Sequence, residues 1–255
     1  MMRGITDTVK HLLIINVIMF IGTMLVGGGN GELFIRWFSI YFPKNELFQP
    51  WQVITHMFMH GSFQHILFNM FLLWMFGTAV EQIIGSKRFL FLYISAGLGA
   101  TLLPLLIDYF DYYSILNKLI ESGFEKNKII STLESGMINT GWESVLGQEK
   151  MKTFMGLNFN KLSLGASGAV MGVLAAFGFM FPNRKLMLLF PPIPIKAKYL
   201  IGGMIGADFI STLLSGTPLL ANSNIGYSAH VGGAITGLII AWYWKKNQFN
   251  QNRWN

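Results

Sequence analysis

The sequence predicts an all-α, polytopic membrane protein built as a bundle of six spanning helices. Of its 255 residues, 52% are hydrophobic and only 12% are charged, whereas a soluble domain has about 25% charged residues. Long stretches lack charge altogether, and a helix needs roughly 20 apolar residues to cross a bilayer. The chain contains no cysteine, which excludes disulfide scaffolds, thiolate metal sites and cysteine nucleophiles.

The uncharged stretches locate the individual helices. They cover 11–31, 47–80, 89–107, 162–183 and 209–244. A further apolar run begins at Tyr199 and is broken only by Asp208, while Gly216 and Pro218 place a turn inside the last stretch. We therefore predict one membrane domain over 1–255, with spanning helices at 12–30, 62–82, 88–107, 165–181, 198–216 and 226–244.

The charges between these helices predict the orientation in the membrane. With a cytoplasmic N-terminus, the inner segments hold eleven cations, against the two acids Asp7 and Glu81; the cations are Arg3, Lys10, Lys87, Arg88, Arg184, Lys185, Lys196, Lys198, Lys245, Lys246 and Arg253. The positive-inside rule then places both termini in the cytoplasm. Because the cations form short clusters and no single basic patch, the net charge of +7 does not predict nucleic-acid binding.

Two segments on the outer side are unusually long. Residues 31–61 are rich in aromatic side chains, which suit the headgroup level of a bilayer. Residues 108–160 are polar and mixed in charge, so we predict an insertion outside the membrane with short helical pieces at 113–120 and 128–133.

Polar side chains inside spanning helices indicate a functional site, because they are costly there. His65 and Asn69, Ser167, and His230 lie near the outer ends of the second, fourth and sixth predicted helices. At 1.5 Å per residue, each is roughly 3–10 Å below the outer end of its helix. Since these three helices run in the same direction, we expect the four side chains to meet.

The residue types at this depth suit acyl transfer. A serine beside a histidine base becomes a nucleophile at neutral pH. His65 and Asn69 are four residues apart on one helix face, and with the Ser167 backbone N–H they could donate to an oxyanion. Ser167 could also be only a helix N-cap, and His230 only a packed, hydrogen-bonded side chain.

Small residues surround both candidate groups. Gly165 and Gly168 flank Ser167 and leave room for a peptide bond to approach. Gly233 and Gly237 form a G-x-x-x-G face that allows close packing of the sixth helix. His56 and His60 have the spacing of a metal-binding pair, but no cysteine or nearby carboxylate completes a site, and we predict neither metal nor cofactor.

The combination resembles the rhomboid family of intramembrane serine proteases. The resemblance rests on His60-x4-His65-x3-Asn69 before and within the second helix, Gly165-Ala166-Ser167-Gly168 opening the fourth, and Ala229-His230-x2-Gly233-x3-Gly237 in the sixth. It covers all six helices in order and omits the insertion at 108–160.

The resemblance implies a six-helix rhomboid-like bundle and a role for each motif residue. Ser167 would be the nucleophile and His230 the general base, without an aspartate. His65, Asn69 and the Ser167 backbone would form the oxyanion hole, and His60 would help to order a water-accessible cavity. Residues 31–61 would be the partly embedded loop that the family carries between its first two helices.

Two positions depart from the family pattern. Gln52 follows Trp51 where the family often has arginine, so a contact of that arginine to lipid or a neighbouring loop is missing. Met171 stands one turn after the serine, where many members have a tyrosine under the histidine. A thioether can fill that space and touch imidazole, but it removes ring stacking.

We therefore predict a serine endopeptidase that cleaves membrane-protein substrates whose spanning segments contain helix-destabilising residues. The alternatives are a catalytically weak or inactive rhomboid-like binding protein and a small transporter. We expect a bacterial plasma membrane as the location, because no transit peptide is evident. Residues 213–225, with the helix before them, are the expected substrate gate. For Asp208 we expect an acid that is neutralised or is hydrogen-bonded to the backbone or a hydroxyl of a neighbouring helix, or a role in holding water in the protein interior and tuning the gate.

Overall fold

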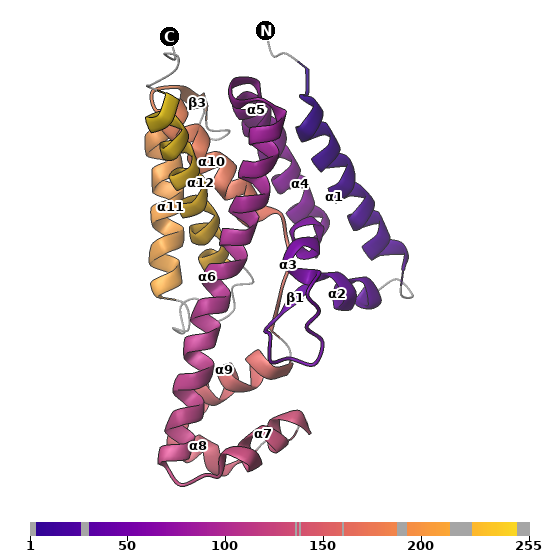
Figure 1. Ribbon diagram of the computed structural model, residues 1–255, viewed down its shortest axis with the longest axis vertical. Coiled ribbons are helices and arrows are strands. Elements are labelled where there is room, and N and C mark those ends of the chain that lie inside the picture. Colours follow the sequence, from indigo (N-terminus) through magenta and orange to yellow (C-terminus); the bar gives the residue numbers. More distant parts are fainter. Residues whose placement is uncertain are drawn as a thin grey trace.

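The computed structural model describes residues 4–26, 31–135, 137, 139–159, 161–187, 193–214 and 226–248. It is an all-α polytopic membrane fold (Figure 1). Within these residues, three helical segments are long and apolar enough to cross a membrane: α1 (Asp7–Leu25), the continuous segment Phe63–Ile84, and α6 (Ser86–Glu121). Phe63–Ile84 comprises α4 (Phe63–Leu72), the π-helical turn η2 (Leu73–Gly77) and α5 (Thr78–Ile84).

Three further helices complete the bundle: α10 (Ser167–Met180), α11 (Ala197–Leu213) and α12 (Tyr227–Gln248). The start of α1 and the end of α12 lie at one end of the molecule (Figure 1). A short antiparallel hairpin, β3 (Lys185–Met187) with β4 (Pro194–Lys196), connects α10 to α11. Residues 27–30, 215 and 216 of the predicted helices lie outside the described part of the chain.

The short helix α10 lies at the centre of the bundle. All of its residues from Gly168 to Gly178 are buried. Fourteen residues span only about 21 Å, less than the roughly 30 Å of a hydrocarbon core. Because α6, α11 and α12 surround it, this helix can end inside the membrane region without exposing its termini to lipid.

Helix α6 is longer than the sequence predicted. It was expected to end at residue 107, yet it continues to Glu121, with Pro104 inside it. The continuation buries one face, which includes Tyr112, Leu116 and Leu119, against the helices of the insertion. The polar composition that placed residues 108–121 in a separate segment therefore describes only the exposed face of the same helix.

The rest of the insertion folds onto this extension. It contains α7 (Lys126–Glu134), α8 (Gly141–Leu146) and α9 (Gln148–Phe159), at the opposite end of the molecule from the start of α1 (Figure 1). Trp142 and Phe154 are fully buried in its own hydrophobic core. Lys161 forms an ion pair with the buried Asp108 of α6, which ties the end of the insertion to the bundle.

The loop between α1 and α4 carries α2 (Glu32–Phe38), β1 (Ile40–Tyr41), α3 (Gln52–Thr55) and the 3-10 turn η1 (His56–Phe58). Its strand β1 pairs with β2 (Leu162–Ser163), directly before α10. Gln52 is fully buried: its amide nitrogen donates to the carbonyl oxygens of Arg36 and Leu47, and its oxygen accepts from the Gln49 N–H. At this position the glutamine holds the loop together from inside.

Candidate active site

The predicted site residues lie in the first two turns of three helices. Ser167 opens α10, His230 is in the first turn of α12, and His65 and Asn69 are on α4. In Figure 1 all three helices begin toward the end of the bundle that carries α7–α9. Ser167 is the first helical residue and not the N-cap: Ala166 occupies that position, and α10 has no side-chain cap.

Pairs of glycines bring α10 and α12 into backbone contact. A Cβ atom at Gly233 would collide with the carbonyl oxygen of Gly168, and one at Gly237 with that of Gly172. A Cβ at Gly168 would lie 3.2 Å from the Ala229 carbonyl oxygen. Ser167 and His230 are the immediate chain neighbours of Gly168 and Ala229, so this crossing brings the backbone at Ser167 close to the backbone at His230. The partner glycine Gly172 was missed, although it has the same four-residue spacing from Gly168.

Gly165 brings His65 next to the serine. Its φ of +131° disfavours any side chain, and a Cβ there would lie 2.8 Å from His65 Cε1 and 3.0 Å from His65 Nε2. The same Cβ position is 3.8 Å from Ser167 Oγ. The His65 ring and the serine hydroxyl therefore both border the space beside Gly165. The Gly165 N–H donates to the His56 carbonyl oxygen over 2.9 Å, which fixes this turn to the loop.

The side chain of Asn69 is buried and its amide nitrogen lies 3.2 Å from Nε2 of His60. Burial lowers the pKa of His60, in the loop before α4, to about 3, so its ring is neutral. Since an amide nitrogen can only donate, Nε2 of His60 accepts and one of the two Asn69 amide hydrogens is used. The described hydrogen bonds use only one of the two amide hydrogens. The His60 and His65 rings pack edge to face, with centroids 5.0 Å apart.

His56 serves the loop. Its Nδ1 donates to the Gln52 carbonyl oxygen over 2.7 Å, and its Nε2 lies 3.0 Å from the Thr101 hydroxyl on α6. Both ring nitrogens are therefore engaged within the protein. In the described part of the chain, no group of three His, Cys, Asp or Glu side chains is arranged to hold a metal ion.

His230 has a carboxylate partner that the sequence did not reveal. Its Nδ1 lies 3.0 Å from Oδ2 of Asp208 on α11, and the two side chains are 17% and 16% exposed. The sequence marked Asp208 as an acid deep inside a span, but the identity of its partner depends on how α11 packs on α12. Met171, the departure from the family pattern, is buried on α10 one turn below Ser167.

The packing of α10 on α6 locates the start of α10 along the length of α6. A Cβ at Gly168 would collide with that of Ala100. Ala100 is about 21 Å along α6 from its first residue, Ser86. Gly168, the chain neighbour of Ser167, therefore packs against a helix that is long and apolar enough to cross a membrane.

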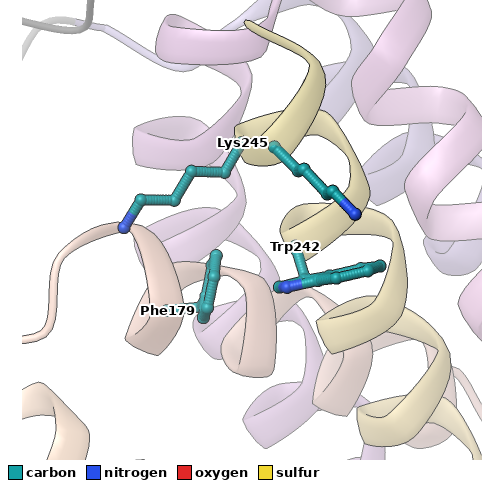
Figure 2. A pocket seen from close by; sticks show the side chains of 4 residues that line it. Phe179, Trp242 and Lys245 are labelled. Carbon is teal, nitrogen blue, oxygen red and sulfur yellow. The ribbon is translucent and has the colours of Figure 1, made fainter. Parts of the chain in front are cut away.

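A hollow of about 440 Å³ lies at the other end of the same helices. Figure 2 shows Phe179, near the end of α10, beside Trp242 and Lys245 of α12; Lys246 completes its lining. Phe179 is about 18 Å along α10 from Ser167. This hollow is therefore separate from the serine and histidine.

The fold is that of a polytopic all-α membrane protein, and a serine and a histidine lie at the starts of two of its helices, which are in backbone contact. The family model described as the Rhomboid domain matches residues 47–247. The chain is a member of the rhomboid family.

Several curated relatives carry rhomboid names. The chain is 27% identical over 195 residues to the mitochondrial Rhomboid protein 1 of Saccharomyces cerevisiae, covering 76% of this chain and 42% of the relative. It is 27% identical over 194 residues to Rhomboid protease AarA of Providencia stuartii, covering 75% and 54%. It is also 27% identical over 193 residues to Rhomboid protease GluP of Bacillus subtilis, covering 75% and 25%. The chain thus spans about half or less of the length of these relatives.

Proposed function

We propose that this protein is an intramembrane serine endopeptidase that hydrolyses peptide bonds in or near the spanning helices of other membrane proteins. The observation that carries the proposal is the close approach of Gly168 to Ala229, because these two residues are the direct chain neighbours of Ser167 and His230. The names of two bacterial relatives, both rhomboid proteases, support it.

In the proposed reaction, the Ser167 hydroxyl attacks the carbonyl carbon of the substrate while its proton passes to His230. The oxyanion that forms accepts hydrogen bonds from the Ser167 backbone N–H, His65 and Asn69. The Ser167 N–H has no partner within α10, because it lies in the first turn. His230 then protonates the leaving amine, and water hydrolyses the acyl ester on Ser167 by the same route, which releases the new carboxylic acid.

The substrate must expose a carbonyl group to Ser167. A regular helix hides its carbonyls in hydrogen bonds, so residues that destabilise a helix near the outer boundary favour cleavage. We propose entry past α11, whose outer residues Phe209, Ile210 and Leu213 are exposed and so available to lipid or to a substrate helix. Most of the expected gate, residues 215–225, lies outside the described residues.

Labelling by a fluorophosphonate probe tests the nucleophile, and cleavage of a test substrate with a helix-destabilised span tests the reaction. We expect both in the purified wild type and neither in Ser167→Ala or His230→Ala, at unchanged melting temperatures. Removing either group should cost about as much as removing both, because they act as a unit. Cleavage that persists in Ser167→Ala contradicts the proposal. If the wild type binds substrates but neither reacts with the probe nor cleaves the substrates, the protein is an inactive member of the family.

We also propose a bacterial plasma membrane as the location, with both termini in the cytoplasm. Tags at the two ends should then be protected from protease in intact cells and accessible in opened ones.

A further inference from the structure

We propose that Asp208 is a positioning residue for His230, so that the site works as a serine, histidine and aspartate in series and not as a two-residue pair. The inference rests on the proposed function, because it assigns His230 the role of general base. Its basis is the contact from His230 Nδ1 to Asp208 Oδ2 over 3.0 Å, made between α12 and α11.

The contact decides which nitrogen of His230 carries the proton. An ionised carboxylate can only accept hydrogen bonds, so Nδ1 must donate. A neutral imidazole carries one proton, which leaves the lone pair on Nε2. Nε2 is then the nitrogen that can take the proton of Ser167, while Nδ1 and its bond to Asp208 stay in place.

Asp208 also offsets the charge that forms during catalysis. When His230 accepts the serine proton it becomes an imidazolium, which is costly at membrane depth unless a counter-charge is close. Among the described residues, the Asp208 carboxylate of α11 contacts His230, and the His65 ring of α4 interacts with it electrostatically. Asp108 of α6 is instead paired with Lys161. Asp208 is therefore the carboxylate placed to stabilise the imidazolium.

Within α11 itself, no described bond involves the Asp208 carboxylate. The hydroxyl of Thr212 bonds the backbone carbonyl of Asp208 and leaves the carboxylate to His230. Cβ atoms at Gly202, Gly203 and Gly206 would meet open space. In this loosely packed helix, the described contact of the Asp208 carboxylate is the one to His230.

The loose packing of α11 suggests one competing role for the same contact. If α11 moves when a substrate enters, the bond between Asp208 and His230 could act only as a latch that holds the gate closed. A latch and a positioning residue predict opposite results when the carboxylate is removed, because loss of a latch should increase turnover or lower KM.

Asp208→Asn is the decisive variant, because it keeps the size of the side chain and removes its charge. Its amide can donate to Nδ1, which favours the histidine form with the proton on Nε2 and blocks base catalysis. In a serine protease with this arrangement the same exchange lowers kcat by about 10⁴. We expect kcat to fall by about 10²–10⁴ with KM unchanged, and slower fluorophosphonate labelling of Ser167. Asp208→Glu, which retains a carboxylate, should recover part of the rate.

Asp108→Asn is the matched control, since it makes the same exchange at another acid on a bundle helix, one that is paired with Lys161. It should leave kcat unchanged. A kcat of Asp208→Asn within threefold of the wild-type value, or above it, would overturn the proposal. It would also be overturned if Asp208→Glu lost as much kcat as Asp208→Asn while the melting temperature of Asp208→Glu stayed at the wild-type value. If Asp208→Asn does not fold, the partial activity expected of Asp208→Glu decides. A wild type that neither labels at Ser167 nor cleaves would instead refute the proposed function itself.

Discussion

Substitution of Gly233 by alanine tests the packing that brings the serine and histidine together. The new Cβ would collide with the backbone carbonyl oxygen of Gly168, an atom that cannot rotate away as a flexible side chain would. Helices α10 and α12 must therefore separate next to Ser167 and His230. Overpacking of this kind costs typically about 1–3 kcal/mol of stability.

The effect on activity should be larger than the effect on stability suggests. A misplacement of roughly 1 Å between reacting groups can cost about 10²-fold in rate, and the collision at Gly168 requires a displacement of this order. Gly233→Ala should thus lower kcat by about 10²-fold. The assay is cleavage of a test substrate at a temperature well below the melting transition, with the melting temperature measured in the same detergent.

Gly203→Ala is the control for this experiment. A Cβ at Gly203 of α11 meets no atom within 4 Å, and replacing glycine by alanine inside a helix favours helix formation by up to about 1 kcal/mol. This variant should be as stable as the wild type or more so, with the same kcat. Equal stability and turnover of Gly233→Ala and the wild type would show that α10 and α12 do not pack through these glycines.

Two further predictions concern other polar contacts. Asn69→Ala should lower kcat by about 10²–10³ with KM little changed, because one oxyanion donor is lost. It should also lower the stability by about 1–3 kcal/mol, because His60 loses its hydrogen-bond partner. A lower melting temperature with a normal kcat would show that Asn69 has only a structural role. Glu81→Gln should lower the stability by about 1.5–3 kcal/mol, because the buried Glu81 carboxylate accepts hydrogen bonds from Thr6, from the N–H groups of Thr8 and Val9 at the start of α1, and from Ser86. Thermal unfolding in detergent measures this loss. An unchanged melting temperature would show that the hydrogen bonds from the start of α1 to Glu81 do not stabilise the fold.

The loop between α1 and α4 illustrates how one residue type can replace another by different contacts. Sequence comparison with the family pattern marked Gln52 as the loss of an arginine contact. In the structure the Gln52 amide bonds three backbone groups of the same loop, and the Trp51 indole donates to the Trp37 carbonyl oxygen. A short buried amide can satisfy backbone groups that it meets inside the loop, and this depends on the path of the chain.

The sequence by itself determined the all-α membrane class, because the hydrophobic effect acts on composition and on the length of uncharged stretches. It also singled out Ser167, His230, His65 and Asn69 as polar residues at a common depth, since depth follows from the rise of a helix per residue. These properties are local along the chain and can be read without knowing which helices touch.

Only the tertiary structure decided which side chains are partners across helices. The bond from Asp208 to His230 depends on the rotation of α11 against α12, and the path of α6 through residue 121 depends on the core that the insertion supplies. Likewise, Gly168 and Gly172 became the counterparts of Gly233 and Gly237 because α10 and α12 cross in one register. Rotation and register are set by the packing of all the surrounding side chains at once, and no local pattern in the chain encodes them.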